Sequence, residues 1–104
     1  MRVVGFILLL ALTANVPAVD FSVLRKQAAA GEAEDQYQLG ELLYEARGVA
    51  RDLDASRRWA IQAAGQGHAR AQYRLASMQL LGEAGPHDAQ AGLALFKKCL
   101  PELT

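Results

Sequence analysis

A set of residues that recurs after 36 positions is the feature that most constrains how this chain folds. The recurring pairs are Gly31 and Gly67, Ala33 and Ala69, Gln36-Tyr37 and Gln72-Tyr73, Leu39 and Leu75, and Asp52 and Asp88. A repeat of this length is typical of arrays of helix pairs, in which each unit buries its apolar face against the next one. We therefore expect the chain to form stacked helical hairpins.

Apolar residues three and four positions apart, bounded by Gly, Asp and Pro, predict where these helices lie. The expected helices are Phe21 to about Ala30, about Ala33 to Ala46, one that Asp52 or Asp54 begins and Gly65 or Gly67 ends, Ala69 to about Leu81, and one that Asp88 begins and Pro101 stops. Gly40 inside a helix costs about 1 kcal/mol relative to alanine, so we expect another backbone to approach it closely. No alternating strand pattern occurs. The expected fold class is all-α, an α/α solenoid of about two and a half helix-hairpin repeats.

The first residues follow the plan of a secretory signal peptide. Arg2 precedes the apolar run Val3–Leu12, and small residues follow as far as Ala18. A membrane span needs about 20 apolar residues, so this run is too short for a stable one. We expect cleavage after Ala18, with Ala14 as the second choice. This gives a signal peptide at residues 1–18, a repeat domain at residues 19–104, and a periplasmic or secreted protein.

Charge and cysteine content narrow the range of partners. The chain has 11 basic and 11 acidic residues, without the basic excess that nucleic-acid binding requires, so we expect no nucleic-acid partner. Cys99 is the only cysteine, so no disulfide can form within the chain. It falls at the repeat position of Ala63, where a buried thiol behaves as a small hydrophobe. An intermolecular bridge or a reactive thiol is the weaker interpretation.

Residues between Leu39 and Leu75 carry a resemblance to a known family. They are Leu39-Gly40, Gly48-Val49, Asp52, Trp59, Ala63-Ala64, Gln66-Gly67-His68 and Ala71. With this spacing the chain resembles the Sel-one-like repeat (SLR) family, relatives of tetratricopeptide repeats whose helix pairs stack into a solenoid. The resemblance extends from about Phe21 to Leu100. Ala46 and Ala76 stand where the family has glycine, and Leu95 stands where it has tryptophan.

The resemblance implies a scaffold for protein complexes, including envelope and secretion assemblies of bacteria. We therefore expect an exported, periplasmic helical-repeat adaptor that binds a protein or peptide partner. Two alternatives stay open. One is a β-lactam-recognising hydrolase, because some cysteine-rich members of the family are associated with β-lactams; the other is a purely structural subunit of an envelope assembly. The lack of a second cysteine beside Cys99 argues against the hydrolase.

Residues that could support catalysis or bind a metal are scarce. An enzyme needs a nucleophile beside a base, or metal ligands that converge. The sequence contains no Ser-x-x-Lys, Gly-x-Ser-x-Gly, His-x-x-x-His or Cys-x-x-Cys motif. His68 and His87 fall in a helix-joining turn and in a Gly-Pro loop, where solvated turn residues are the stronger interpretation. We expect no enzyme activity, no cofactor and no metal site.

Two polar stripes are the candidate partner-binding surface. Glu34, Gln38, Glu41 and Glu45 share one helix face, and their equivalents in the next repeat are Arg70, Arg74, Ser77 and Leu81. Side by side, these stripes could form one concave surface with an acidic and a basic half, suited to a protein or peptide. Alternatively, they are solvated faces that pair with each other. The aromatic residues Trp59, Tyr37, Tyr44 and Tyr73 occupy positions where packing is the stronger interpretation.

The last helix is a second candidate for docking. Its apolar residues are Leu93, Leu95, Phe96 and Leu100. Repeats cannot bury their faces alone, and a terminal repeat needs a polar outer side. We expect whichever of these residues face outward to dock onto a second copy of the chain, giving a homo-oligomer, or onto another protein.

Overall fold

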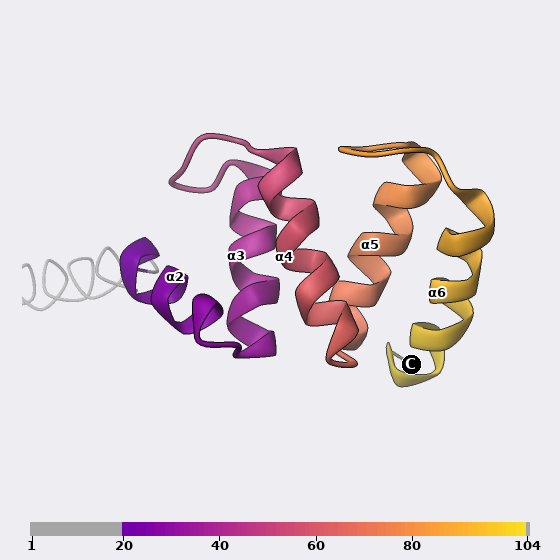
Figure 1. Cartoon of the computed structure of the whole chain (residues 1–104), viewed down its shortest axis with the longest axis horizontal. Helices are drawn as coiled ribbons and strands as arrows, with labels where there is room; N and C mark the ends of the chain where they lie inside the picture. The colour runs from indigo at the N-terminus through magenta and orange to yellow at the C-terminus, as the bar shows by residue number, and fades with distance from the viewer. Residues whose placement is uncertain (1–19, 104) are drawn as a thin grey trace, which may run out of the picture.

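The computed structural model describes residues 20–103. Within this range the chain forms five helices and no strand, which confirms the all-α prediction. The helices are α2 (Phe21–Ala29), α3 (Ala33–Glu45), α4 (Leu53–Gly65), α5 (Ala69–Leu81) and α6 (Ala89–Leu103). They stand in chain order along the long axis of the molecule, and each packs mainly against the helix before it and the helix after it (Figure 1). This arrangement is the solenoid that the 36-residue period predicts.

The ends of the helices show why these segments fold as they do. Asp52 precedes α4 and its Oδ1 accepts the backbone N–H of Ala55 at 3.0 Å. Asp88, its repeat equivalent, accepts the N–H of Ala91 in the same way. Such side chains satisfy amide groups that have no partner inside the helix. The predicted starts of α4 and α6 are thereby confirmed, with Asp52 rather than Asp54 as the cap of α4.

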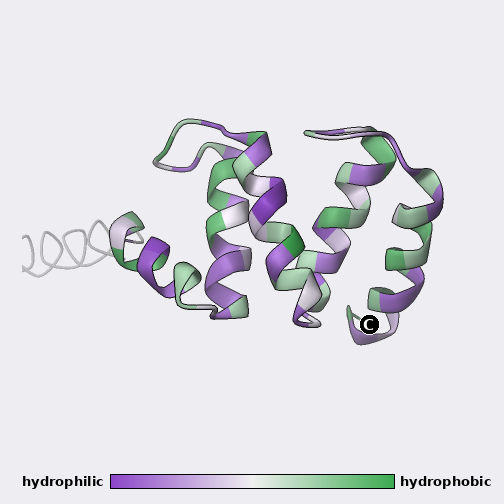
Figure 2. Ribbon diagram, viewed as in Figure 1, coloured by the Kyte–Doolittle hydropathy of each residue, from purple (hydrophilic) through white to green (hydrophobic). Residues whose placement is uncertain are grey.

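Two apolar clusters form the core. The first joins α2 to α3 through Leu24, Ala28, Leu39, Leu42 and Leu43, and Trp59 packs partly buried against it. The second joins α4 to α5 through Ala60, Ala63, Ala64, Ala71 and Leu75. Apolar and polar residues alternate along every helix in Figure 2, because each helix turns one stripe toward these clusters. Much of the second cluster is alanine, so its helices pack closely.

A buried glutamine ties each hairpin to the one before it. The Gln36 side-chain amide on α3 donates to the carbonyl of Ala28 near the end of α2, at 3.1 Å. Gln72 on α5 donates to the carbonyl of Ala64 near the end of α4, at 3.2 Å. Both glutamines are 3% exposed. Each of these carbonyls also accepts the backbone N–H of the glycine after its helix, Gly31 or Gly67, so the glutamine adds a second hydrogen bond at the same position of both repeats.

The close approach predicted at Gly40 occurs. A Cβ at this position would lie 3.3 Å from the carbonyl oxygen of Ser56 on α4. The Ser56 hydroxyl in turn donates to the Gly40 carbonyl at 2.8 Å. In the second hairpin the glycine is on the other helix: Gly92 of α6 faces Ala76 of α5, and a Cβ on it would lie 2.9 Å from the Ala76 carbonyl oxygen. The alanine at position 76 is therefore matched by a glycine opposite.

The prediction that Pro101 stops the last helix was wrong, because α6 continues to Leu103. Proline lacks one backbone donor and crowds the preceding turn, but the residues after it can keep helical dihedral angles. The other helix ends fall within one residue of expectation: α2 ends at Ala29 and α3 at Glu45. The predicted signal peptide, residues 1–18, lies outside the described residues.

Candidate functional site

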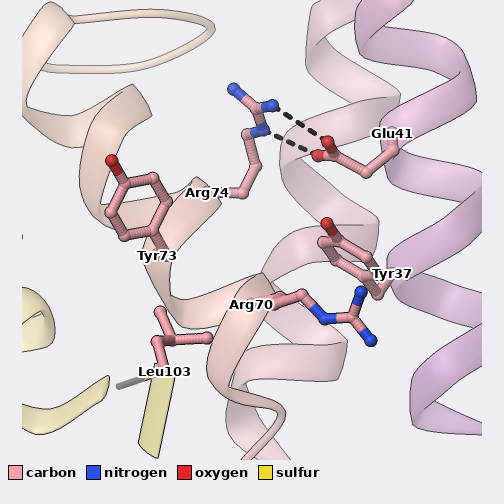
Figure 3. A pocket seen from close by; sticks show the side chains of 6 residues that line it. All are labelled: Tyr37, Glu41, Arg70, Tyr73, Arg74 and Leu103. Atoms are coloured by element: carbon pink, nitrogen blue, oxygen red, sulfur yellow. Dashed lines mark hydrogen bonds and ion pairs between the residues drawn. The ribbon is translucent and has the colours of Figure 1, made fainter. Parts of the chain in front are cut away.

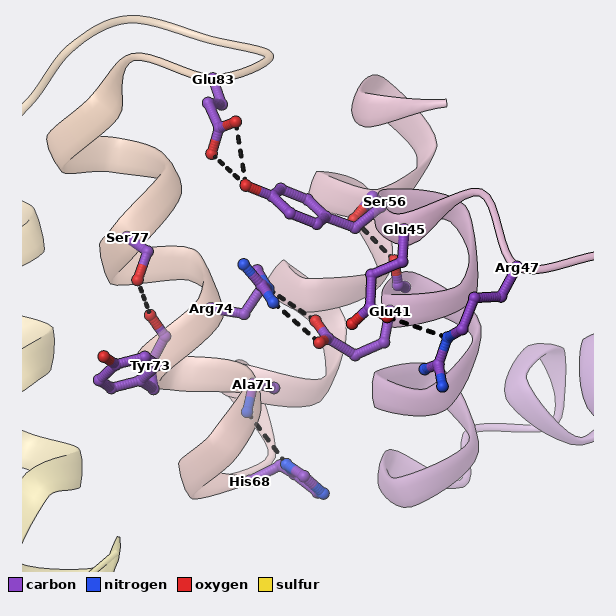
Figure 4. A network of polar contacts seen from close by, with 12 residues as sticks. Glu41, Glu45, Arg47, Ser56, His68, Ala71, Tyr73, Arg74, Ser77 and Glu83 are labelled. Atoms are coloured by element: carbon purple, nitrogen blue, oxygen red, sulfur yellow. Dashed lines mark hydrogen bonds and ion pairs between the residues drawn. The ribbon is translucent and has the colours of Figure 1, made fainter. Parts of the chain in front are cut away.

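The two polar stripes lie side by side on α3 and α5, where charged side chains reach from one helix to the other (Figure 4). Glu41 and Arg74 make the central contact. Arg74 Nε is 2.6 Å from Glu41 Oε1 and Arg74 Nη2 is 2.9 Å from Glu41 Oε2, so the guanidinium binds both carboxylate oxygens. The Arg74 guanidinium also lies over the Tyr44 ring, 4.0 Å from its centroid. Glu41 is 7% exposed, so this pair joins two repeats inside the structure.

Glu34 makes the second contact between the stripes. Its Oε2 pairs with Nε2 of His68, and its Oε1 accepts from Gln38 at 3.0 Å. These hydrogen bonds, that from His68 above all, hold the pKa of the Glu34 carboxyl below its ordinary value. The other ring nitrogen of His68, Nδ1, accepts the N–H of Ala71 and so caps α5. Arg70 approaches Glu34 only to 3.8 Å.

The remaining residues of the stripes have local partners. Glu45 pairs with Arg47 in the loop that follows α3, at 3.0 Å. The Ser77 hydroxyl donates to the carbonyl of Tyr73 on its own helix, also at 3.0 Å. Neither residue bridges α3 and α5. The structure therefore brings together Glu34, Glu41, Arg70 and Arg74 of the predicted set, and places Gln38, Glu45 and Ser77 beside them.

A groove lies next to these bridges. Its volume is about 290 Å³, and it is lined by Tyr37, Glu41, Arg70, Tyr73, Arg74 and Leu103. Tyr37 and Tyr73 occupy the same repeat position on α3 and α5, and their rings flank the groove together with Arg70 (Figure 3). Leu103 contributes a wall because α6 continues past Pro101. The groove thus combines apolar walls with hydroxyl groups, two arginine guanidiniums and the Glu41 carboxylate that Arg74 binds.

Tyr73 corrects one interpretation of the sequence. Its repeat position suggested a packing residue, but the residue is 47% exposed and touches the Phe96 ring edge to face, with 5.0 Å between centroids. Tyr37 is half-buried and stacks on the His68 ring at 4.7 Å. The signal available in the sequence was two tyrosines 36 residues apart, with Arg70 and Arg74 on either side of the second one.

The candidate docking residues of α6 divide into two groups. Leu95 and Phe96 are half-buried: Leu95 packs against the second core cluster and Phe96 against Tyr73. Leu93 and Leu100 are 53% and 44% exposed and face away from the neighbouring helix. Leu100 occupies the repeat position of Ala64, which α5 covers. The outward apolar surface of α6 therefore centres on Leu93 and Leu100.

Residues 20–103 also bear on three other possible features: a metal site, a membrane-spanning helix and a reactive thiol. No group of three or more potential metal ligands occurs there, and no helix in that range is long and apolar enough to cross a membrane. Cys99 is fully buried, and this burial raises the pKa of its thiol. A buried thiol of raised pKa is a poor nucleophile. This burial matches the interpretation of Cys99 as a small core residue.

Helix hairpins that stack in chain order, with a groove across α3 and α5, define a helical-repeat solenoid. The Sel1 repeat model matches residues 33–68 and 69–98. The chain belongs to the Sel1 repeat family. The two matched segments correspond to α3 with α4 and to α5 with α6, and α2 precedes them as an additional half-repeat.

Solved structures of this fold show the same stacking. The chain is similar to c5321, a protective antigen of uropathogenic Escherichia coli with an SLR fold, at 30% identity and a TM-score of 0.75 over 81% of this chain and 18% of that one. A Sel1 repeat protein from Oxalobacter formigenes is 32% identical, with a TM-score of 0.75 over 78% of this chain and 24% of that one. Cysteine rich protein B of Helicobacter pylori, at 18% identity and a TM-score of 0.72 over 78% of this chain and 61% of its own, shares the fold. Among curated proteins, no sequence matches significantly.

The chain spans about a fifth to a quarter of the length of the first two similar structures.

Proposed function

We propose that this protein is an exported adaptor that binds a protein or peptide partner through the groove between α3 and α5. The observation that supports this proposal most directly is the groove itself, which is lined by the exposed ring of Tyr73 and by the exposed guanidinium of Arg70, which lies over Tyr37. Aromatic residues and arginine are enriched where proteins bind one another. Membership of a family that mediates protein interactions supports the same assignment.

Site-specific photocrosslinking tests this function. A photoreactive phenylalanine analogue replaces Tyr73 in the groove, and in a matched control it replaces Ile61, which is equally exposed on α4, at 48%. We expect a discrete crosslinked partner, identified by mass spectrometry, from the Tyr73 position and none from Ile61. Crosslinking to the same protein from both positions, or from Ile61 alone, would contradict a partner site in the groove.

We also propose that the chain is exported to the periplasm and that residues 1–18 are removed on the way. The proposal is based on the sequence of residues 1–18, with a basic residue, a short apolar run and small residues before Val19. Mass spectrometry of the protein recovered from a bacterial periplasmic fraction should give an amino terminus at Val19. An intact amino terminus in the cytoplasmic fraction would exclude this route.

A further inference from the structure

Hydrogen-bonding groups in the groove are unevenly satisfied. The carboxylate that lines the groove already has a partner, since Arg74 binds both oxygens of Glu41, and both oxygens of the neighbouring Glu34 are taken by His68 and Gln38. Among the donors, Arg74 has Glu41 as its partner, whereas Arg70 has no acceptor within hydrogen-bond distance among residues 20–103. Its guanidinium makes no hydrogen bond with any described residue, because its one carboxylate neighbour is 3.8 Å away. Its side chain is 59% exposed.

Two tyrosine hydroxyl groups in the groove can also donate hydrogen bonds. The hydroxyls of Tyr37 and Tyr73 also make no hydrogen bond within residues 20–103. Burial, and then the charge of Glu41, raises the pKa of Tyr37, so its hydroxyl stays protonated at neutral pH. The Arg70 guanidinium lies 5.4 Å from the centroid of the Tyr37 ring, which places one hydroxyl-bearing ring directly beside the cation. The Arg70 guanidinium can only donate, and the two hydroxyls can donate as well, so a ligand with acceptors and a negative charge complements these groups.

Apolar walls stand next to the same donors. Tyr73 is 47% exposed and Leu103 is 39% exposed, and both line the groove with Arg70. The groove holds about 290 Å³, enough for only a short piece of a peptide. The last residue of a chain carries its α-carboxylate and its side chain on one Cα atom. It can therefore place a charge on Arg70 and an aliphatic group against Tyr73 and Leu103 within one small site.

We propose that the groove binds the carboxyl-terminal residue of a partner protein, with an aliphatic side chain, through Arg70, Tyr37 and Tyr73. This inference rests on the proposed function and specifies its partner chemistry. Arg70 is the group that receives the carboxylate in a forked, two-hydrogen-bond arrangement. Arg74 lies beside the ligand, but its pairing with Glu41 gives it a structural role.

The test uses the full chain and three synthetic hexapeptides, with binding followed by NMR shifts of residues 70–74. The first peptide ends in leucine with a free carboxylate, the second is the same peptide as an amide, and the third is an amide with an internal glutamate. We expect the free acid to bind about tenfold more tightly than either amide, because only the free acid offers Arg70 a charged acceptor at the end of the chain. Equal binding of acid and amide would overturn the proposal, and so would equal binding of the internal glutamate.

Arg70→Gln supplies the second half of the test, because it removes the charge from an exposed side chain. Arg58→Gln is the matched control: Arg58 is exposed on α4, outside the groove. Arg70→Gln should reduce the preference for acid over amide to about one, whereas Arg58→Gln should leave it unchanged; the same preference in both variants would overturn the proposal. If Tyr73 crosslinks a partner while the peptides show no preference for the acid, the carboxylate assignment fails and the proposed function stands.

Discussion

At the scale of single residues, Ala46 has an unfavourable backbone conformation. It ends α3 in the left-handed region, with φ 57° and ψ 38°. Its repeat equivalent, Gly82, ends α5 with φ 69° and ψ 30°. Alanine in this region is disfavoured by contact between its Cβ and the following carbonyl oxygen, which glycine avoids. The left-handed conformation therefore explains why the family has glycine at this position. This chain keeps the same conformation with alanine.

Ala46→Gly should consequently stabilise the protein, and Gly82→Ala should destabilise it. We expect changes of about 1 kcal/mol in the free energy of unfolding. Glycine avoids the cost of the left-handed conformation, but its greater freedom in the unfolded chain offsets part of that gain. Urea unfolding followed by circular dichroism measures both. Ala30→Gly is the control, because Ala30 also ends a helix but at φ −74°. A similar gain from Ala30→Gly would contradict the explanation.

The charged pair between repeats also acts through individual side chains. Arg74→Met leaves Glu41 buried without its partner, and losses of about 3 kcal/mol in the free energy of unfolding are typical of such changes. Arg70→Met removes a more exposed arginine that is only 3.8 Å from its carboxylate, so it should change stability by under about 1 kcal/mol. Urea unfolding of the two variants compares them directly. Equal losses would show that Glu41 does not depend on Arg74.

At the scale of helices, the sequence predicted the order and approximate bounds of all those described. The period gave the hairpins, and the capping residues Asp52 and Asp88 marked where helices begin. It did not predict that α6 passes Pro101, because proline removes one hydrogen bond without fixing the dihedral angles of later residues. Nor did it predict the exposure of Tyr73. A repeat position indicates which side of a helix a residue is on, but its exposure depends on what packs there.

The sequence also did not predict the close contact between α5 and α6 within the second hairpin. Ala76 looked like the loss of a glycine, because comparison at one repeat position does not include the residue opposite. In the structure Gly92 lies opposite, and so each hairpin has one glycine at its closest point, on α3 in the first and on α6 in the second. The packing of a hairpin depends on the combined size of the facing pair.

Gly92→Ser should therefore be strongly destabilising, since a Cβ would lie 2.9 Å from both the Ala76 carbonyl oxygen and Leu80 Cγ. Overpacking of this kind costs roughly 1–3 kcal/mol. Adding Ala76→Gly recreates the Gly40 and Ser56 pair of the first hairpin and should restore part of the loss. Thermal unfolding of the single and double variants measures this. Strictly additive effects would mean that the two positions do not compensate each other.

Gly65→Ala is the control for this prediction. Gly65 is helical, and a Cβ on it would meet no atom within 4 Å. Alanine there should leave the protein as stable or up to about 1 kcal/mol more stable, because alanine favours helices. A loss at Gly65 as large as the loss at Gly92 would indicate a general effect of adding a methyl group.

At the scale of the whole molecule, the α6 end is the apolar surface that a further unit would cover. Ala64 is 8% exposed beneath α5, whereas its equivalent Leu100 is 44% exposed. We expect the chain to self-associate at micromolar concentration through this face, and Leu100→Glu to weaken that association. Sedimentation velocity measures it, with Ile61→Glu as a control of matched exposure. A monomeric unmodified chain would contradict self-association through α6.

The linear order of packing has a mechanical consequence. Within residues 20–103, the closely packed helix pairs are all consecutive ones, so no helix closes the structure back onto its beginning. A force applied to the two ends would then pass through every interface in series instead of being shared among many. Under tension the hairpins should therefore separate and unfold one at a time. A partner bound across α3 and α5 would strengthen the interface between the two repeats and raise the force needed to separate them.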